Sequence, residues 1–401
     1  MQKSGMLDRA FWILYFLLVL LFFTKPLVVN WDPAEYLAQG KFIFGGRGYA
    51  SWYRPPVWPL VLGIFWKTGF PMLFTMKALA TLIYLSIPLV AYFKFRGALQ
   101  LDGRAFIGLV IATQPIFFQY SHAPLSHMIA TLFLVLSFAT EGIASGMFSA
   151  LAGLSRFTFF LWAPFSLFYK NPKKKIEGMA LVVIPFVLAT TLILGSPFLA
   201  FSDAGAVINH PDFIWFWQES PLFYFKKLLL FSPFMLLALF GRRPSKWAFG
   251  LALAYFTFLP HKEERFIIDI IVYGAIALSE NFRKLPLILV AFHLFFLPFT
   301  APLYQPPLTI YEQIPNGVNV IGMSPEVNLV RDVNFTDWFY PSKPFTFSGM
   351  NYCIYSQSAT PCKTDDIACN SIVNDFMAQC GNWNIIARED GFIVARRPEQ
   401  I

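Results

Sequence analysis

The chain of 401 residues is 56% hydrophobic, contains 47 phenylalanines and has only 13% charged residues. Ordinary soluble domains carry about a quarter charged residues, so this composition excludes a water-soluble enzyme and indicates a protein of the bilayer. The formal net charge of +8 does not indicate nucleic acid as a partner, because the basic residues cluster in short loops between apolar runs, where they act as orientation signals.

Apolar runs recur along the chain as far as Pro302. A membrane crossing takes roughly 20 apolar residues, or fewer where a short helix is packed against protein. The first run has no small-residue cleavage pattern after it and is expected to be a retained anchor. The predicted crossings are 11–29, 76–95, 105–120, 126–141, 144–156, 157–169, 178–199, 223–241, 247–260, 266–279 and 285–302.

The charge of the loops predicts the orientation of these crossings, because loops rich in Lys and Arg stay in the cytoplasm. The basic loops contain Lys3 with Arg9, "KFRG" with Arg104, "KNPKKK", "GRRPSK" and "NFRK". All five lie inside only if 142–169 enters and returns as two half-helices that turn at Arg156, within protein or a water-filled cavity. The predicted fold is an all-α polytopic membrane protein with about eleven crossings, its N-terminus inside and its C-terminus outside.

The segment 30–75 is predicted to be an outer loop that carries juxtamembrane helices. "DPAEYLAQG" predicts a helix that begins with Asp32 and Glu35, has Pro33 in its first turn and ends at Gly40. Asp32 fits the N-cap of this helix. A carboxylate at the membrane surface beside a cavity also fits a general base, because partial burial tunes its proton affinity. The two roles are compatible.

Arg54 follows a glycine-rich stretch of the same loop and precedes a pair of prolines. Its side chain fits two roles, snorkelling to lipid head groups or binding a phosphate with its guanidinium fork. The apolar "VWPLVLGIFW" that follows is too short for a comfortable crossing, and its tryptophans predict a helix along the membrane interface.

"HKEERFIID" is the densest group of ionisable residues among the predicted crossings. Asp269 lies inside the next crossing, four residues after Arg265, which predicts a pair on one helical face. An ionisable group inside a membrane indicates a functional site by default, although this pair fits a structural role as well. His122 and His127 flank the outer turn "APLS", where a single histidine is more often a satisfied polar residue than a ligand. The candidates for the wall of an outer cavity are His122, His127, Arg156, His261, Lys262, Glu263, Arg265 and Asp269.

The segment 304–401 is polar and holds all four cysteines, which predicts a small α/β domain outside the membrane after a membrane domain at 1–303. "TDDIACNSIVNDFMAQCG" predicts a helix capped by Thr364 and Gly381, and "NIIAREDGFIVAR" predicts two strands around Asp390-Gly391.

The cysteines predict disulfides in an oxidising compartment. Cys369 and Cys380 would lie about 16 Å apart on the predicted helix, too far for a bond between them. Two arrangements are left: Cys353 with Cys369 and Cys362 with Cys380, or Cys353 with Cys380 and Cys362 with Cys369. The sequon at Asn334 is compatible with the same outer location.

The order of these motifs resembles the GT-C superfamily of integral-membrane glycosyltransferases, especially its protein-mannosyltransferase and aminoarabinose-transferase branch. The resemblance lies in "DPAEYLAQG", "GGRGY" and "YRPPVWPLVLG" in the first outer loop, then in "QPIFFQYSHAPLSHM" and "LAGLSRFTFFLWAPF". "HKEERF" is similar to the motif of the lipid-linked-oligosaccharide and GPI-anchor mannosyltransferases. The matching patches extend from Asp32 to about Arg265, and the tail carries no family signal.

The resemblance implies transfer of a sugar, such as the hexose mannose, from a polyprenyl-phosphate or dolichyl-phosphate carrier to an acceptor hydroxyl on the outer face, with inversion. Asp32 matches the catalytic acid of the first loop, with Glu35 as the alternative. His127 stands where relatives often have Asp or Glu, so a metal or two-acid scheme does not carry over. The residues expected to bind the donor phosphate are Arg54, Arg156, His261, Lys262 and Arg265.

The expected partners are a lipid-linked sugar, a glycan, lipid or protein acceptor, and the bilayer. No cofactor is expected, and no spacing of His, Cys, Asp and Glu indicates a metal site, although a divalent cation is compatible with the chemistry. The alternative function is a flippase or exporter of a lipid-linked sugar, which the lack of a repeat of interrupted spans disfavours. Short loops and a compact tail favour a prokaryotic cell membrane, archaeal ones included, with the active site and the tail outside.

Overall fold

The chain forms two compact units. The computed structural model describes residues 2–49, 54–96, 103–199, 201–202, 204–205, 219–259, 262–337, 346–356 and 367–398. The membrane unit comprises Met1–Val28, Lys77–Asp203 and Glu219–Leu303, and the C-terminal unit comprises Val29–Met76, Ala204–Gln218 and Tyr304–Ile401. The loop 30–75 was predicted to be part of the membrane domain, whereas the structure groups this loop with the polar tail.

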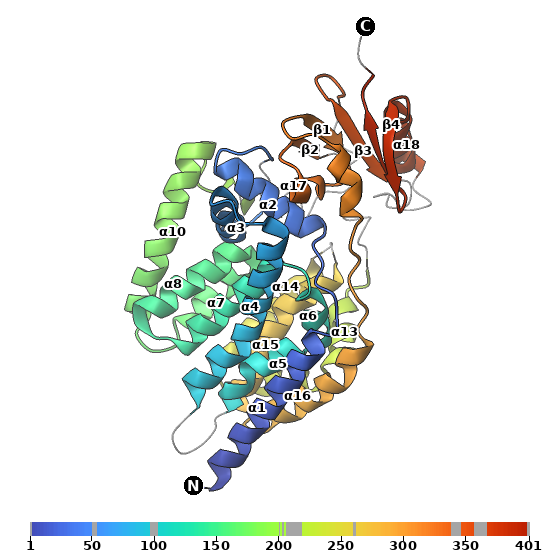
Figure 1. Cartoon of the computed structure of the whole chain (residues 1–401). Helices are drawn as coiled ribbons and strands as arrows, with labels where there is room; N and C mark the ends of the chain where they lie inside the picture. Colours follow the sequence, from blue (N-terminus) through green and yellow to red (C-terminus); the bar gives the residue numbers. More distant parts are fainter. Residues whose placement is uncertain are drawn as a thin grey trace. The chain divides into compact units, whose positions relative to one another are not determined.

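The membrane unit is built from helices (Figure 1). They are α1 (Gln2–Phe22), most of α4 (Met72–Phe95), η1 (Gly103–Phe106), α5 (Ile107–Thr113), α6 (Pro115–Tyr120), α7 (Ser126–Ala139), α8 (Gly142–Ser155), η2 (Phe157–Leu161), α9 (Trp162–Ser166), α10 (Pro172–Leu194), α13 (Phe223–Phe231), η3 (Pro233–Phe240), α14 (Ser245–Phe258), η4 (Glu264–Phe266), α15 (Ile267–Asn281), α16 (Leu285–Phe296) and η5 (Leu297–Phe299).

Among the described residues, α4 and α10 are each long and apolar enough to cross a membrane, and α13 with η3 makes a third span if the bent pair counts as one. Only 11% of the apolar window of α10 is buried, and Leu181, Ile184, Leu188 and Leu192 are exposed on it. A continuous apolar surface of this kind suits contact with lipid rather than water. The predicted count of about eleven crossings and the predicted orientation stay predictions.

The helices break between the predicted half-helices 144–156 and 157–169, and also within the predicted crossings 105–120 and 223–241. The chain is extended at Arg156, with φ −158° and ψ 112°, so α8 ends at Ser155 and the 3₁₀ helix η2 starts at Phe157. The break therefore lies at the residue where the charge pattern places it. The other two breaks were not predicted: α5 and α6 are separated by the extended residue Gln114, and α13 and η3 meet at Ser232 with a bend of 109°.

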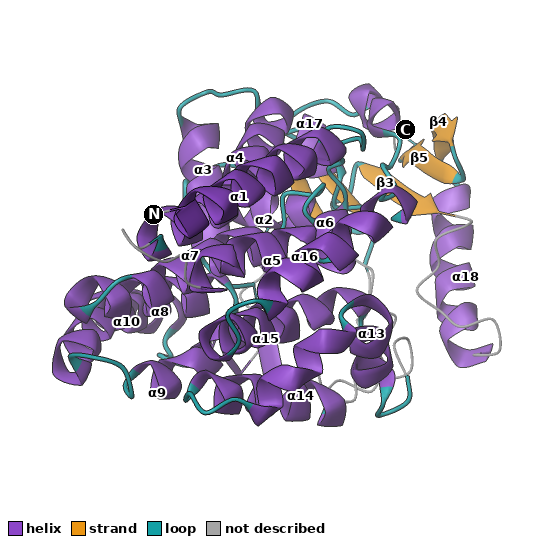
Figure 2. Cartoon of the chain, turned by 90° about the horizontal axis from the view of Figure 1, so that it is seen from below, coloured by secondary structure: helices purple, strands orange, loops and turns teal. Residues whose placement is uncertain are grey.

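Small residues allow α8 and α10 to pack closely side by side, as both views show (Figures 1 and 2). A Cβ atom on Gly146 would collide with the carbonyl oxygen of Lys175, and one on Gly178 would collide with that of Ile143. Close approach through small residues is the usual way in which helices associate in a membrane, where the hydrophobic effect does not drive them together.

The C-terminal unit combines the first loop with the tail. Its elements are α2 (Trp31–Ile43), α3 (Val57–Lys67), η6 (Leu308–Gln313), β1 (Asn319–Gly322), α17 (Val327–Val330), β2 (Asn334–Asp337), β3 (Tyr352–Ser356), α18 (Ile367–Gly381), β4 (Asn384–Glu389) and β5 (Phe392–Arg396). The strands form a mixed sheet in the order β2-β1-β3-β5-β4, in which β1 runs parallel to β2 and β3, and β5 runs antiparallel to β3 and β4.

Both faces of this sheet are covered, because side chains alternate between the two faces along each strand. Ile354 and Val394 belong to a core shared with η6 and α17. Cys353 and Ile393 belong to the other core, which α18 completes with Phe376. Figure 2 shows α18 beside the strands. The tail is thus a small α/β domain, as predicted.

The local predictions for the tail agree with the structure where it is described. Asp390 and Gly391 both have positive φ, 48° and 80°, and join β4 to β5 as a tight hairpin. Helix α18 ends at Gly381, while Thr364 lies outside the described residues. Cys353 and Cys380 form a disulfide with a Cα–Cα distance of 6.0 Å, which matches the second predicted arrangement. Cys362 and the side chain of Cys369 lie outside the described residues.

Candidate functional site

Two carboxylates of the C-terminal unit lie one helical turn apart at the start of α2. Asn30 occupies the N-cap position of this helix and makes no side-chain cap, so Asp32 lies in the first turn and is not the cap. Glu35 follows three residues later, which places both side chains on one face. Asp32 is 6% exposed and Glu35 is 0% exposed. Burial of two acids this close requires a partner charge.

Arg54 supplies that charge. Its Nη2 lies 2.9 Å from Oδ1 of Asp32, and the same guanidinium is ion-paired with Glu35. The hydroxyl of Tyr49 donates to Oε1 of Glu35 at 3.1 Å, and the Arg54 guanidinium lies 5.3 Å from the ring centroid of Tyr36. We call Asp32, Glu35 and Arg54 the acidic cluster, because it holds two carboxylates and one guanidinium. The structure engages Arg54 with carboxylates, whereas the sequence analysis predicts it as a phosphate ligand.

Helix α2 is held in place at Gly40. A Cβ atom there would lie 2.5 Å from the carbonyl oxygen of Pro59 and 2.9 Å from the amide nitrogen of Gly63. The missing side chain therefore lets α2 pack directly on α3. The prediction that Gly40 ends the helix is wrong, because α2 continues to Ile43. Glycine is common just after a helix, but here it serves close approach.

Lys41 fastens the same helix to the tail. Its Nζ donates to the carbonyl oxygens of Asn328 at 2.8 Å and Arg331 at 2.9 Å. Burial lowers the pKa of Lys41 to about 8, against an opposing effect of the Asp332 carboxylate. The ring of Tyr49, which contacts Glu35, also lies 5.6 Å from that of Phe335 on β2. The tail thus contacts Lys41 and Tyr49 and helps to hold the acidic cluster in place, a role that was not predicted from the sequence.

A second ionic group lies within the membrane unit, at the break after α8. Arg156 donates through Nε to both carboxylate oxygens of Asp269, at 2.6 and 2.7 Å, and the hydroxyl of Thr158 donates to Oδ2 at 2.6 Å. Asp269 is fully buried in the first turn of α15, and the side chain of Arg156 is 14% exposed. We call these three residues the Arg156 cluster. The guanidinium carbon of Arg156 also lies 5.4 Å from the ring centroid of Phe266.

The predicted helical pair of Arg265 and Asp269 is not the main contact of either residue. Arg265 lies in the 3₁₀ helix η4 and is ion-paired with Glu263, and α15 begins only at Ile267. The spacing rule for an α-helix does not apply across this boundary. Asp269 is instead neutralised by Arg156, which is 113 positions away along the chain.

The remaining residues of "HKEER" are engaged locally. Nζ of Lys262 donates to the carbonyl oxygens of Leu259 at 2.5 Å and Thr257 at 3.1 Å, at the end of α14. Burial lowers the pKa of Lys262. Lys227, which the sequence analysis missed, donates to Glu264 at 2.5 Å. His261 lies outside the described residues. Lys262 therefore caps a helix end, a role that competes with phosphate binding.

The two histidines of the turn that is predicted to lie outside, His122 and His127, are buried. Nδ1 of His122 lies 2.8 Å from the carbonyl oxygen of Phe118 and Nε2 lies 3.0 Å from that of Phe22, whose ring stacks on the imidazole at 4.4 Å. Burial lowers the pKa of His122. His127 is buried in the first turn of α7. In the part of the chain that is described, no group of three or more His, Cys, Asp or Glu residues is arranged to hold a metal ion.

The fold is similar to those of two proteins of known structure. Over 99% of both chains it matches ArnT from Cupriavidus metallidurans bound to undecaprenyl phosphate, with a TM-score of 0.62 at 11% identity. The apo state of the same protein matches over the full length of both chains, with a TM-score of 0.62 at 12% identity. Arabinofuranosyltransferase AftD from Mycobacteria matches 98% of this chain and 40% of its own, with a TM-score of 0.51 at 12% identity.

No protein-family model and no curated protein sequence matches the chain. At such low identity the structural similarity shows the fold alone. The fold is ArnT-like, and two of the described helices are long and apolar enough to cross a membrane. A specific relation to mannosyltransferases does not follow from it.

Proposed function

We propose that the chain is a membrane glycosyltransferase that uses a polyprenyl-phosphate sugar as donor and a hydroxyl group as acceptor. Three observations support this: the ArnT-like fold, the undecaprenyl phosphate bound to ArnT in one of the matching structures, and the buried acidic cluster. The acidic cluster carries the proposal, because two carboxylates that share one guanidinium retain a negative charge that can accept a proton.

Asp32 is the proposed general base. It is the more exposed of the two acids, and its ion pair with Arg54 uses Oδ1. Glu35 is fully buried beneath Arg54 and Tyr49, so its proposed role is to position the guanidinium. Arg54 then holds the Asp32 carboxylate in place rather than binding the donor. This changes the role that the resemblance implies for Arg54.

Arg156 is the proposed ligand of the donor phosphate. Among the residues described, it donates to Asp269 through Nε, so its Nη groups can donate hydrogen bonds to phosphate oxygens. Guanidinium groups suit phosphate because they donate two parallel hydrogen bonds. Asp269 and Thr158 fix the side chain, and preorganised donors of this kind stabilise charge that develops in the transition state.

The proposed reaction is a single displacement. Asp32 takes the proton of the acceptor hydroxyl while its oxygen attacks the anomeric carbon. The bond from that carbon to the phosphate oxygen breaks, its electron pair stays on the phosphate, and the polyprenyl phosphate leaves with inversion of the sugar. The motif "HKEERF" favours a hexose such as mannose, and the active site is proposed to be extracytoplasmic.

Transfer kinetics of three variants test these roles. Asp32→Asn keeps an oxygen that can accept from Arg54 and loses only the base, so kcat is expected to fall about 10²- to 10⁴-fold. Glu35→Gln is expected to lose less, since it perturbs the position of Arg54. Glu312→Gln removes a carboxylate of the same unit that lies outside the acidic cluster and is expected to match the wild type. A wild-type rate for Asp32→Asn would eliminate the assignment.

Arg156→Lys separates binding from base catalysis. It keeps the positive charge but loses the guanidinium fork, so the KM for the donor is expected to rise about tenfold or more while the pH dependence of kcat stays as in the wild type. An unchanged KM would show that Arg156 does not bind the donor.

A further inference from the structure

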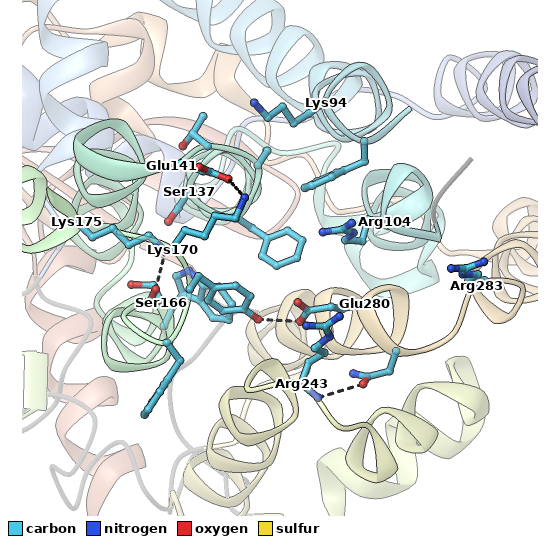
Figure 3. A pocket seen from close by; sticks show the side chains of 18 residues that line it. Lys94, Arg104, Ser137, Glu141, Ser166, Lys170, Lys175, Arg243, Glu280 and Arg283 are labelled. Carbon is cyan, nitrogen blue, oxygen red and sulfur yellow. Dashed lines mark hydrogen bonds and ion pairs between the residues drawn. The ribbon is translucent and has the colours of Figure 1, made fainter. Parts of the chain in front are cut away.

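A cavity of about 640 Å³ lies in the membrane unit, away from the Arg156 cluster. It opens between the end of α4, the end of α7, the loop that leads into α10, and the end of α15 (Figure 3). Glu280, near the end of α15, lines it, whereas Asp269 lies in the first turn of the same helix. At 1.5 Å per residue the two carboxylates are about 16 Å apart along the helix axis. The cavity is therefore a separate site.

The charge of its lining is strongly positive. Two carboxylates line the cavity, Glu141 and Glu280. The cationic residues that line it are Lys94, Arg104, Lys170, Lys175, Arg243 and Arg283. They belong to four of the five basic loops that the sequence analysis assigns to the cytoplasm. Loop cations that act only as orientation signals need not converge on one cavity.

Both carboxylates are already engaged. Glu280 accepts from the hydroxyls of Tyr169 at 2.8 Å and Ser245 at 2.6 Å. Glu141 is paired with Lys170 at 3.5 Å, in an exposed contact that contributes little. The six cationic side chains that line the cavity outnumber the two carboxylates, so the lining keeps an excess of positive charge that an anion from outside the chain can balance.

The wall of the cavity is ordered and partly aromatic. Lys175 is buried, donates from Nζ to the carbonyl oxygen of Ser166 at 2.7 Å and lies 5.2 Å from the ring centroid of Tyr169 (Figure 3). The rings of Phe138 and Trp162 also line the cavity, 6.1 Å apart. Cations next to aromatic rings at the end of membrane helices fit a molecule with an anionic head and an apolar body.

We propose that this cavity binds the phosphate of an anionic phospholipid from the leaflet on its side of the membrane. Basic pockets between membrane helices on the cytoplasmic side bind such head groups, and guanidinium groups are well matched to phosphate. Arg104 and Arg243 are the proposed phosphate ligands, from η1 and from the loop before α14. This site is independent of the proposed transfer reaction.

The test uses the purified full chain in detergent and measures retained phosphatidylglycerol and phosphatidylcholine by native mass spectrometry. The variant Arg104→Gln/Arg243→Gln removes two cations from the cavity. The control Lys173→Gln/Lys246→Gln removes two cations from the first turns of α10 and α14 that do not line the cavity. Wild-type protein is expected to prefer phosphatidylglycerol, the cavity variant to bind it at least tenfold more weakly, and the control to stay within twofold.

A parallel titration with inorganic phosphate identifies the source of the phosphate. Competition by lipid but not by millimolar phosphate supports a lipid, and binding of phosphate with the same dependence on Arg104 and Arg243 supports a soluble phosphate compound in the same site. Equal behaviour of the two double variants would overturn the proposal. If the cavity variant fails to fold, Arg104→Lys/Arg243→Lys keeps the charge and is expected to weaken binding several-fold; unchanged binding would also overturn it.

Discussion

Removal of the Asp269 carboxylate is expected to destabilise the membrane unit strongly. In Asp269→Asn, the Arg156 guanidinium loses its counter-charge and one of the two oxygens that accept from it at 2.6 and 2.7 Å, while only 14% of its side chain reaches solvent. A buried charge that loses its partner costs about 3–5 kcal/mol. Thr158→Val removes only the hydroxyl that donates at 2.6 Å and is expected to cost about 1–2 kcal/mol.

The double variant Arg156→Gln/Asp269→Asn separates a pair from two independent residues. It leaves two neutral amides and no uncompensated charge, so its cost is expected to be close to that of one single variant rather than to the sum. At about 2 °C per kcal/mol for a unit of this size, each single variant is expected to unfold about 6–10 °C lower, and the double variant to fall by a similar amount.

Thermal unfolding of the detergent-solubilised chain, followed by intrinsic fluorescence, provides the measurement. Glu141→Gln/Lys170→Gln serves as the control, because this pair is 59% and 79% exposed and is expected to change little. If the losses of Arg156→Gln and Asp269→Asn add in the double variant, the two residues do not stabilise each other. That result would also contradict the proposal that Asp269 positions Arg156 to bind phosphate.

Three further predictions concern the C-terminal unit. The pKa of Lys41 is about 8 in the folded chain, below its usual value, so the unfolded chain binds more protons than the folded chain between pH 8 and 10. The free energy of unfolding should therefore rise over this pH range by about 2 kcal/mol relative to that of Lys41→Met. Parallel pH profiles of the two proteins would contradict this. Gly40→Ala should destabilise the chain and reduce transfer, because its Cβ would lie 2.5 Å from a backbone oxygen, while Gly250→Ala, with 3.7 Å to its nearest neighbour, should be neutral or slightly stabilising; equal effects would refute the packing argument. The disulfide joins residues that are 27 positions apart, so Cys353→Ala/Cys380→Ala should lose about 3–4 kcal/mol of unfolding free energy. Reductant should then have no further effect through this bond. An unfolding midpoint equal to that of the wild type would argue against the bond.

Local signals predicted local structure well. Asp390-Gly391 between alternating residues specified the hairpin, and the charge of the loops on either side placed the break at Arg156. These features depend on neighbours in the sequence, and a single sequence contains that information. The tail was also recognised as a separate domain from its change in composition, and its α/β character followed from the predicted helix and hairpin.

Contacts between distant parts of the chain were not accessible in the same way. Lys41 reaches the carbonyl oxygen of Asn328, 287 positions away, and nothing in either segment points to the other. The same holds for Arg156 and Asp269, whose pairing displaced the predicted partner Arg265. Gly40 was misread because a glycine that ends a helix and one that admits a neighbouring helix look alike in sequence.

Purified chain in proteoliposomes with a radiolabelled polyprenyl-phosphate sugar can distinguish transfer from transport. The proposed function predicts that label moves to an acceptor and that free polyprenyl phosphate appears in equal amount, with both rates reduced at least 10²-fold in Asp32→Asn. Movement of the intact lipid-linked sugar across the bilayer, without release of polyprenyl phosphate and without an effect of Asp32→Asn, would contradict it and identify a carrier.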